Sequence, residues 1–144
     1  MVPLTRKSLL AIEAVLDVAL HSRPDPVQAR EITERQKVPQ RYLEQIMQAL
    51  VRADILRGVR GPRGGYRLAR ERRRIRIDEI VRVISALETP EDQAIVRSEI
   101  GKQAVAPLCD QLSDQLMASL NKVTIEDLCK DVPAAPSQPG DFTI

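Results

Sequence analysis

The 144-residue sequence contains no tryptophan, one phenylalanine, two tyrosines and one histidine. Its core must therefore be built from aliphatic side chains, which the 43% hydrophobic content can supply. No stretch approaches the ~18 consecutive apolar residues of a membrane-spanning helix. The first seven residues also lack the apolar run of a secretory signal. These absences predict a cytoplasmic protein with an aliphatic core and no membrane partner.

Cysteine is almost as scarce as the aromatic residues. Cys109 and Cys129 are too few for a disulfide framework, and no CxxC pair is present for zinc. The single histidine, His21, is expected at a helix end, where its charge would favour the helix dipole. No nucleophile–base pairing, metal-ligand cluster or phosphate-binding glycine loop is recognisable. The sequence therefore predicts neither an enzyme nor a metal site.

Positive charge is concentrated in one segment, although the net charge is only +2. Residues 57–76 contain nine arginines and one glutamate, whereas residues 77–144 carry a net charge of −7. A basic block within an otherwise acidic chain indicates a polyanionic partner such as nucleic acid. The alternative is a solvated arginine-rich loop.

Apolar spacing predicts a mainly α-helical chain with one small β-hairpin. A first helix is expected over residues 5–21, with Thr5 as its N-cap. Its expected buried face is Leu9, Ile12, Leu16 and Leu20. Two prolines within residues 21–26 form a turn, and a short helix over residues 27–36 follows.

The next helix, expected over residues 39–52, has two contrasting faces. Its apolar face is Leu43, Ile46, Met47 and Leu50. Its polar face begins at Gln40 and is composed of Arg41, Gln45, Gln48 and Arg52, flanked by Tyr42 and Glu44. A short helix, a turn and a helix that exposes Arg and Gln are typical of a helix-turn-helix, because these side chains pair with guanine and adenine edges. An ordinary solvated helix face is the alternative for this element alone.

A basic hairpin is predicted next, with strands over residues 55–60 and 66–69. Its tip contains Gly61, Gly64 and Gly65, which allow the backbone a close approach to another surface. Arg60 and Arg63 lie at this tip, where a narrow arginine-bearing loop suits a minor groove. A helix-turn-helix followed by such a hairpin is the winged-helix arrangement, so residues 1–77 are expected to form a DNA-binding domain.

Residues 78–130 are expected to connect this domain to a subunit interface. Asp78 is the predicted cap of a helix over residues 78–88, and residues 89–103 are predicted to be a loop or a poorly formed helix. A long helix is then predicted over residues 104–122, with Met117 outside its apolar stripe. That stripe is Val105, Leu108, Cys109, Leu112, Leu116, Leu120 and Val123.

The long helix would span ~28 Å, which is more than so small a domain covers easily with its own elements. We therefore expect the stripe to form a two-fold homodimer interface; packing against the first helix is the alternative. Thr124 and Asp127 have the spacing of a capping box for a last helix over residues 125–130. Proline and glycine predict a disordered tail over residues 131–144.

Together these segments resemble the Rrf-two (Rrf2) family of bacterial winged-helix transcriptional regulators. The matching segments cover residues 4–5, 16–20, 32–36, 42–45, 59–69 and 125–128. The resemblance implies a homodimer that binds double-stranded DNA at a partly palindromic operator and regulates transcription, as repressors of this family do. It also implies base contacts from Arg41, Tyr42, Glu44 and Gln45, and entry of Arg60 into the minor groove.

One departure from the family pattern concerns its sensor. Cluster-binding members carry three cysteines, in some with a nearby histidine, before and at the start of the long helix. Residues 89–108 contain neither residue type here, and the corresponding positions include Gln103 and Ala106. We therefore expect no iron–sulfur cluster, since one would need Cys109 with a non-cysteine ligand such as Glu13 or His21.

Three further hypotheses remain open from the residues. Cys109 could act as a thiol switch at a subunit interface, or it could be a small apolar core residue. The winged helix could instead contact an acidic protein surface rather than DNA. The residues identify no small-molecule or protein effector.

Overall fold

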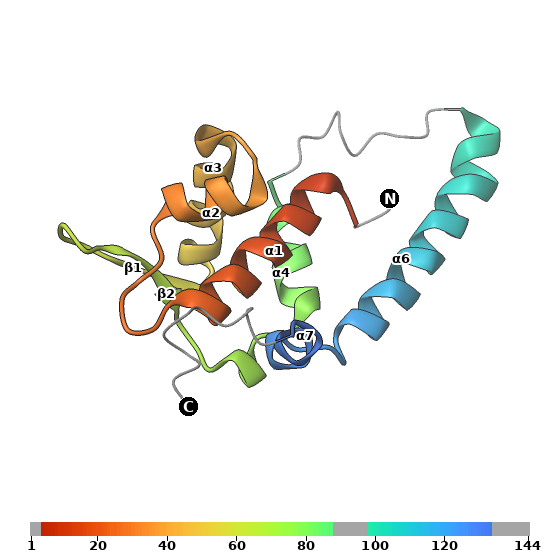
Figure 1. Cartoon of the computed structure of the whole chain (residues 1–144). Helices are drawn as coiled ribbons and strands as arrows, with labels where there is room; N and C mark the ends of the chain where they lie inside the picture. Colours follow the sequence, from red (N-terminus) through yellow and green to blue (C-terminus); the bar gives the residue numbers. More distant parts are fainter. Residues whose placement is uncertain (1–3, 88–97, 134–144) are drawn as a thin grey trace.

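The computed structural model describes residues 4–87 and 98–133 of the chain (Figure 1). Within these residues the structure has six α-helices, two β-strands, a turn of 3-10 helix (η1) and a π-helical segment (η2). The elements in chain order are α1 (Arg6–His21), α2 (Ala29–Gln36), α3 (Gln40–Arg52), β1 (Leu56–Val59), β2 (Gly65–Leu68), η1 (Arg72–Arg74), α4 (Ile77–Ser85), η2 (Gly101–Val105), α6 (Ala106–Leu120) and α7 (Ile125–Asp131). The mainly α-helical architecture with one hairpin is therefore confirmed.

Helix α1 begins as predicted, but the centre of its buried face is shifted from the predicted one. The Thr5 hydroxyl accepts a hydrogen bond from the Ser8 amide, which completes a capping box. The fully buried apolar side chains are Ala11, Ala14, Val15 and Val18, whereas Leu9 is 50% exposed. The predicted face is half confirmed: Ile12 and Leu16 are partly buried against the core, whereas Leu9 and Leu20 are exposed, and the centre of the buried face is formed by the smaller side chains.

Helices α2 and α3 form the predicted helix-turn-helix. Ile32 of α2 is fully buried, and Lys37 adopts a left-handed conformation in the turn that follows. The predicted apolar face of α3 is confirmed, since all four of its side chains are fully buried: Leu43, Ile46, Met47 and Leu50. Pro39 is the N-cap of α3, so its missing amide hydrogen costs no helical hydrogen bond.

The β-hairpin is antiparallel, and it is anchored to the turn before α2. Leu56 lies opposite Leu68 in the register, and Val59 lies opposite Gly65. Tyr66 exchanges two backbone hydrogen bonds with Val27, of 2.7 and 3.0 Å. This bridge ties β2 to the start of the helix-turn-helix, so the hairpin and α3 form parts of one unit.

Asp78 does not cap α4, contrary to the prediction. Helix α4 begins at Ile77, and the Glu79 carboxylate accepts a hydrogen bond from the Arg76 amide at 3.0 Å. Asp78 is buried instead and accepts a hydrogen bond from the Asn121 side chain at 2.9 Å. Its carboxylate therefore helps to hold the end of α6 against α4.

The C-terminal helices differ from the prediction at their start and agree with it at their end. Ile100 already has helical torsion angles, and η2 continues directly into α6, so residues 100–103 follow the helical one of the two predicted alternatives, and the helix starts before residue 104. The earlier part of that predicted loop, residues 88–97, lies outside the described residues, as does the predicted tail from residue 134 onward. Helix α7 has the predicted capping box, with Thr124 and Asp127 exchanging hydrogen bonds of 3.0 and 3.1 Å.

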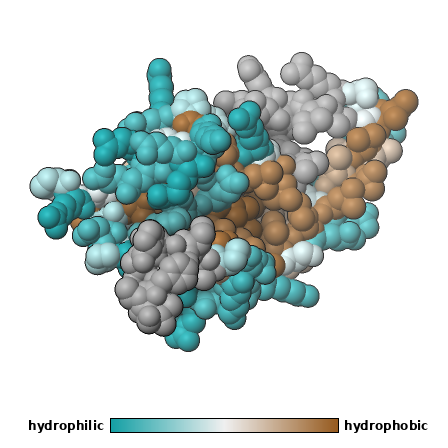
Figure 2. Space-filling view, in the orientation of Figure 1, coloured by the Kyte–Doolittle hydropathy of each residue, from teal (hydrophilic) through white to brown (hydrophobic). Residues whose placement is uncertain are grey.

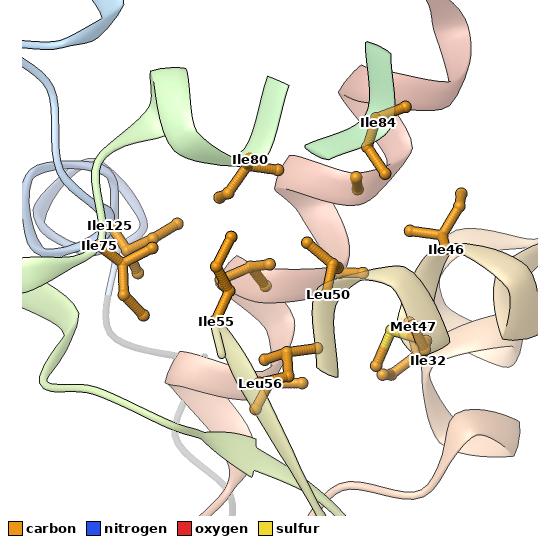
Figure 3. Close-up of a cluster of buried hydrophobic side chains, with 14 of the residues drawn as sticks. Ile32, Ile46, Met47, Leu50, Ile55, Leu56, Ile75, Ile80, Ile84 and Ile125 are labelled. Carbon is orange, nitrogen blue, oxygen red and sulfur yellow. The ribbon is translucent and has the colours of Figure 1, made fainter. Parts of the chain in front are cut away.

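A single aliphatic cluster joins the N-terminal and C-terminal elements. Figure 3 shows Ile80 and Ile84 of α4 directed toward the side chains of α3 and β1. Ile75 and Ile125 lie side by side, and the Ile125 amide donates to the Ile75 carbonyl at 2.9 Å. Both are fully buried, so α7 belongs to the core that supports the winged helix.

Candidate nucleic-acid interface

One face of α3 is free for contact with a partner because the other face is buried. The polar residues predicted for this role are all exposed, except Tyr42: Gln40, Arg41, Glu44, Gln45 and Gln48. Within the described residues, the Arg41 guanidinium has no recorded hydrogen bond or ion pair. The Gln40 side-chain amide donates to the Glu44 carboxylate at 3.0 Å, which orients that carboxylate on the helix surface.

Tyr42 lies on the flank of α3 and is partly buried against the core. The Lys7 ammonium lies 5.6 Å from the centre of its ring, within the range of a cation–π interaction. This contact joins the start of α1 to the recognition helix. No local sequence signal could have predicted it, because the two residues lie far apart in the chain.

The tip of the wing presents two unpaired arginines. Arg60 and Arg63 are exposed, and neither has a recorded side-chain hydrogen bond or ion pair in the part of the chain that the structure describes. The turn between them is closed by a 2.9 Å hydrogen bond from the Gly64 amide to the Gly61 carbonyl. Gly61 has a φ of +113°, a conformation that favours glycine.

Gly64 and Gly65 are required by packing within the chain itself. A Cβ atom at Gly64 would lie 2.2 Å from the Val59 carbonyl oxygen, and one at Gly65 would lie 2.4 Å from the Val27 carbonyl oxygen. Glycine at these positions therefore permits the turn and the bridge to α2. Their close approach to a partner remains a prediction.

The nine arginines of residues 57–76 divide into two groups with different roles. Several are committed to intrachain bonds: Arg67 to two backbone carbonyls, Arg70 to Glu79, Arg72 to Glu126, Arg73 to Glu71, and Arg76 to Asp78 and Glu79. Within the described residues, Arg57, Arg60, Arg63 and Arg74 have no such side-chain partner. The charge available to a polyanion is thus much smaller than the sequence count indicates.

Helix α6 carries the predicted apolar stripe, and the two ends of that stripe have different surroundings. Leu120 and Val123 pack against the core together with Met117, which was wrongly predicted to lie outside the packing face. Leu108 and Leu112 are each 54% exposed. Figure 1 shows α6 projecting from the body, and Figure 2 shows hydrophobic side chains along it and across the adjoining face.

Residues 4–131 match the model of the Rrf2 family, described as an iron-dependent transcriptional regulator. The chain belongs to the Rrf2 family. Among curated relatives, the regulator IscR of Xenorhabdus nematophila is 37% identical over 133 residues, covering 89% of this chain and 79% of that protein. IscR of Vibrio campbellii is 35% identical over 130 residues, and the alignment covers 89% of this chain and 77% of that protein.

Solved structures agree with this membership of the Rrf2 family. The IscR of T. potens superposes with a TM-score of 0.70 at 30% identity, over 96% of this chain and 95% of its own. CymR, the global cysteine regulator of B. subtilis, superposes with a TM-score of 0.69 at 26% identity, over 92% and 99% of the chains. This Rrf2 chain is therefore a DNA-binding transcriptional regulator with a winged-helix fold, and it is not an enzyme.

The residues described do not fit the iron site that the family description implies. Cys109 and Cys129 are each partly buried, and they are the only cysteines in the sequence. Among the described residues, no three His, Cys, Asp or Glu side chains gather closely enough to hold a metal ion.

In the same residues, no helix is both long and apolar enough to cross a membrane.

Proposed function

We propose that this Rrf2-family regulator binds a partly palindromic operator as a homodimer. Helix α3 would enter the major groove, where Arg41, Tyr42, Glu44 and Gln45 contact base edges. Gln40 and Gln48 extend the same face. The exposed guanidinium of Arg41, unpaired among the described residues, carries the proposal most directly, because the opposite face of α3 is anchored in the core.

The wing would enter the neighbouring minor groove through Arg60. Its partner arginine at the tip, Arg63, is suited to phosphate contact because it lies on an exposed turn. Gly61, Gly64 and Gly65 keep this tip narrow, so that the backbone can approach the duplex closely.

The second copy would bind along α6. The stripe Val105, Leu108, Cys109, Leu112, Leu116, Leu120 and Val123 is proposed as the interface, with its N-terminal half making most of the contact with the partner. Val105, Leu108 and Leu112 are exposed large apolar side chains, which favours burial against a second chain. A two-fold pair of α6 helices would then present two recognition helices to the two halves of the operator.

Base readout is tested by comparing two arginine variants on operator and random duplexes. Arg41→Ala is expected to cost about 1–3 kcal/mol on the operator and to relax preference at one base position. Arg63→Ala should weaken binding to both duplexes alike. The affinity of the parent protein for either duplex should fall steeply as the salt concentration rises. Lys122→Ala, which removes an exposed cation beyond the end of α6, is the control. Equal losses on both duplexes for Arg41→Ala would contradict base readout by α3, and weak salt dependence would favour an acidic protein partner.

We further propose that the regulator works without an iron–sulfur cluster. Such a cluster would need Cys109 together with ligands other than cysteine, and no such group gathers among the described residues. Protein purified without oxygen should be colourless, with iron and sulfide far below one equivalent per chain. A brown protein with stoichiometric iron and sulfide would contradict this proposal. A regulator of chromosomal operators acts in the cytoplasm, where both thiols are expected to stay reduced.

A further inference from the structure

A hollow of about 790 Å³ lies between the C-terminal end of α1, strand β2, the η1 segment and α7. We name it the α1–α7 hollow. Its charged lining consists of five arginines and two glutamates, a net charge of +3: Arg23, Arg67, Arg70, Arg72, Arg73, Glu71 and Glu126. None of the proposed base-contacting residues lines it. In Figure 1, α3 and α7 lie on opposite sides of α1, so this hollow is separate from the recognition helix.

The arginines of the hollow are not all neutralised. Arg72 pairs with Glu126 at 2.8 Å and Arg73 pairs with Glu71 at 2.6 Å. Arg67 instead donates to the backbone carbonyl oxygen of Ser22 at 2.8 Å and to that of Pro24, and no described carboxylate accepts from it.

Arg23 adds a second uncompensated charge to the same hollow. It is exposed, and no side-chain hydrogen bond or ion pair is recorded for it among the described residues. Arg67 is partly buried, which strengthens its attraction for an anion compared with a fully solvated guanidinium. The two side chains therefore offer two positive groups in one half-enclosed space.

The remaining lining indicates the size and character of the ligand. Ala19, Leu20 and Leu68 supply an apolar wall beside the arginines. A guanidinium binds carboxylate or phosphate oxygens through paired hydrogen bonds. We propose that the α1–α7 hollow binds a small organic anion with at least two carboxylate or phosphate groups, which acts as an effector of the regulator. Its effector role rests on the proposed operator binding.

The position of Arg67 connects this hollow to the wing. Arg67 lies in β2, opposite Arg57 of β1, and its side chain reaches the turn that follows α1. An anion bound to Arg67 cancels positive charge at the base of the wing and competes with the carbonyls of that turn. Operator binding is therefore weaker when the hollow is occupied.

Calorimetric titration of the full-length chain with citrate tests the site, with ionic strength held constant by chloride. One citrate is expected to bind per chain, more tightly than inorganic phosphate, because its carboxylates can reach separate guanidinium groups. Arg67→Gln and Arg23→Gln should each weaken citrate binding about tenfold or more, as expected for loss of a charge-assisted contact. Arg6→Gln removes the same charge from the exposed start of α1, away from the hollow, and should leave the affinity unchanged. Arg23→Gln keeps the test valid if Arg67→Gln fails to fold, because the exposed Arg23 side chain forms no hydrogen bond or ion pair with the described residues.

Several results would overturn the inference. The parent and the three variants could bind citrate with the same affinity, or citrate could bind no more tightly than phosphate. Either result would show that the hollow has no specific site for a multivalent anion. Displacement of citrate by random duplex in proportion to DNA binding would assign the arginines to the DNA surface instead. Operator binding is measured first without citrate. If no operator binding is found without citrate, the proposed function is contradicted. If the operator is bound equally well with and without citrate, only the effector role is contradicted.

Discussion

Replacing two leucines of the α6 stripe with aspartate should separate the proposed dimer. Leu108 and Leu112 lie one turn apart, and each is 54% exposed in the single chain. Their exposed halves have no covering element among the described residues, because α6 extends away from the body (Figure 1). The double variant L108D/L112D therefore alters the surface of the subunit with little effect on its core.

The size of the effect follows from the area that remains to be buried. Full burial of a leucine side chain contributes ~1.5–3 kcal/mol, so burial of the exposed half contributes about 1 kcal/mol. Two-fold symmetry places four such side chains in one interface, which amounts to about 4 kcal/mol. This corresponds to a dimer dissociation constant that is about a thousandfold higher. Burial of an unpaired carboxylate opposes association further, so this value is a lower bound.

Sedimentation equilibrium over a range of concentrations measures the dissociation constant directly, and operator binding by the same samples tests the functional consequence. Ala118→Asp places the same charge on an exposed position of α6 about 120° around the helix from Leu112, and it should remain dimeric. Circular dichroism should show unchanged helix content in both variants. An L108D/L112D protein that dimerises as tightly as the parent would refute the assignment of this stripe to the subunit interface.

Three further predictions concern stability. Gly65→Ala should destabilise the fold by several kcal/mol and weaken operator binding, as measured by urea unfolding and DNA titration, because its Cβ would clash with the Val27 carbonyl. Arg35→Met should lower the free energy of unfolding by about 2 kcal/mol, because the Arg35 guanidinium donates two 2.7 Å hydrogen bonds to buried Asp17. The same hydrogen bonds raise the pKa of Arg35. A thermal midpoint equal to the parent's would contradict this prediction. Hydrogen bonds in the α7 capping box lower the pKa of Asp127, so the stabilising effect of its carboxylate is complete above about pH 4 and is lost as the pH falls further. Asp127→Asn should therefore make the stability of the protein less dependent on pH below about 4. An acid-unfolding midpoint equal to the parent's would contradict this prediction.

Recognition of the winged helix from the sequence depended on signals that are local in the chain. The apolar spacing of α3, the capping residues Thr5 and Thr124, and the glycine-rich turn each act within a few residues. Their physical effects therefore depend little on the rest of the fold at these positions. The tertiary structure confirmed these elements, whereas it corrected the buried face of α1 and the role of Asp78.

The corrections share one cause, which is that burial depends on neighbours that the local sequence does not specify. The fully buried side chains of α1 are alanines and valines, whereas Leu9 and Leu20 are exposed, because α1 packs against α4, α7 and β2 along this face. The Oδ2 atom of Asp78 accepts a hydrogen bond from Asn121, which lies 43 residues away in the chain, and the side chain is buried rather than used as a helix cap. An amphipathic pattern indicates that a helix has an apolar and a polar face, but which residues are buried depends on how neighbouring elements pack against that helix.

The sequence by itself determined the order and type of the helices, the turn and the wing, with bounds within a few residues for most of them, and it placed Arg41 on an exposed face and Arg60 at a tip. Capping, helical period and glycine content act over a few neighbouring residues, so they can be recognised without coordinates. Only the tertiary structure decided which arginines of the basic segment remain free. Arg67 finds its acceptors at Ser22 and Pro24, more than 40 residues away. Such pairings arise only when distant segments fold together.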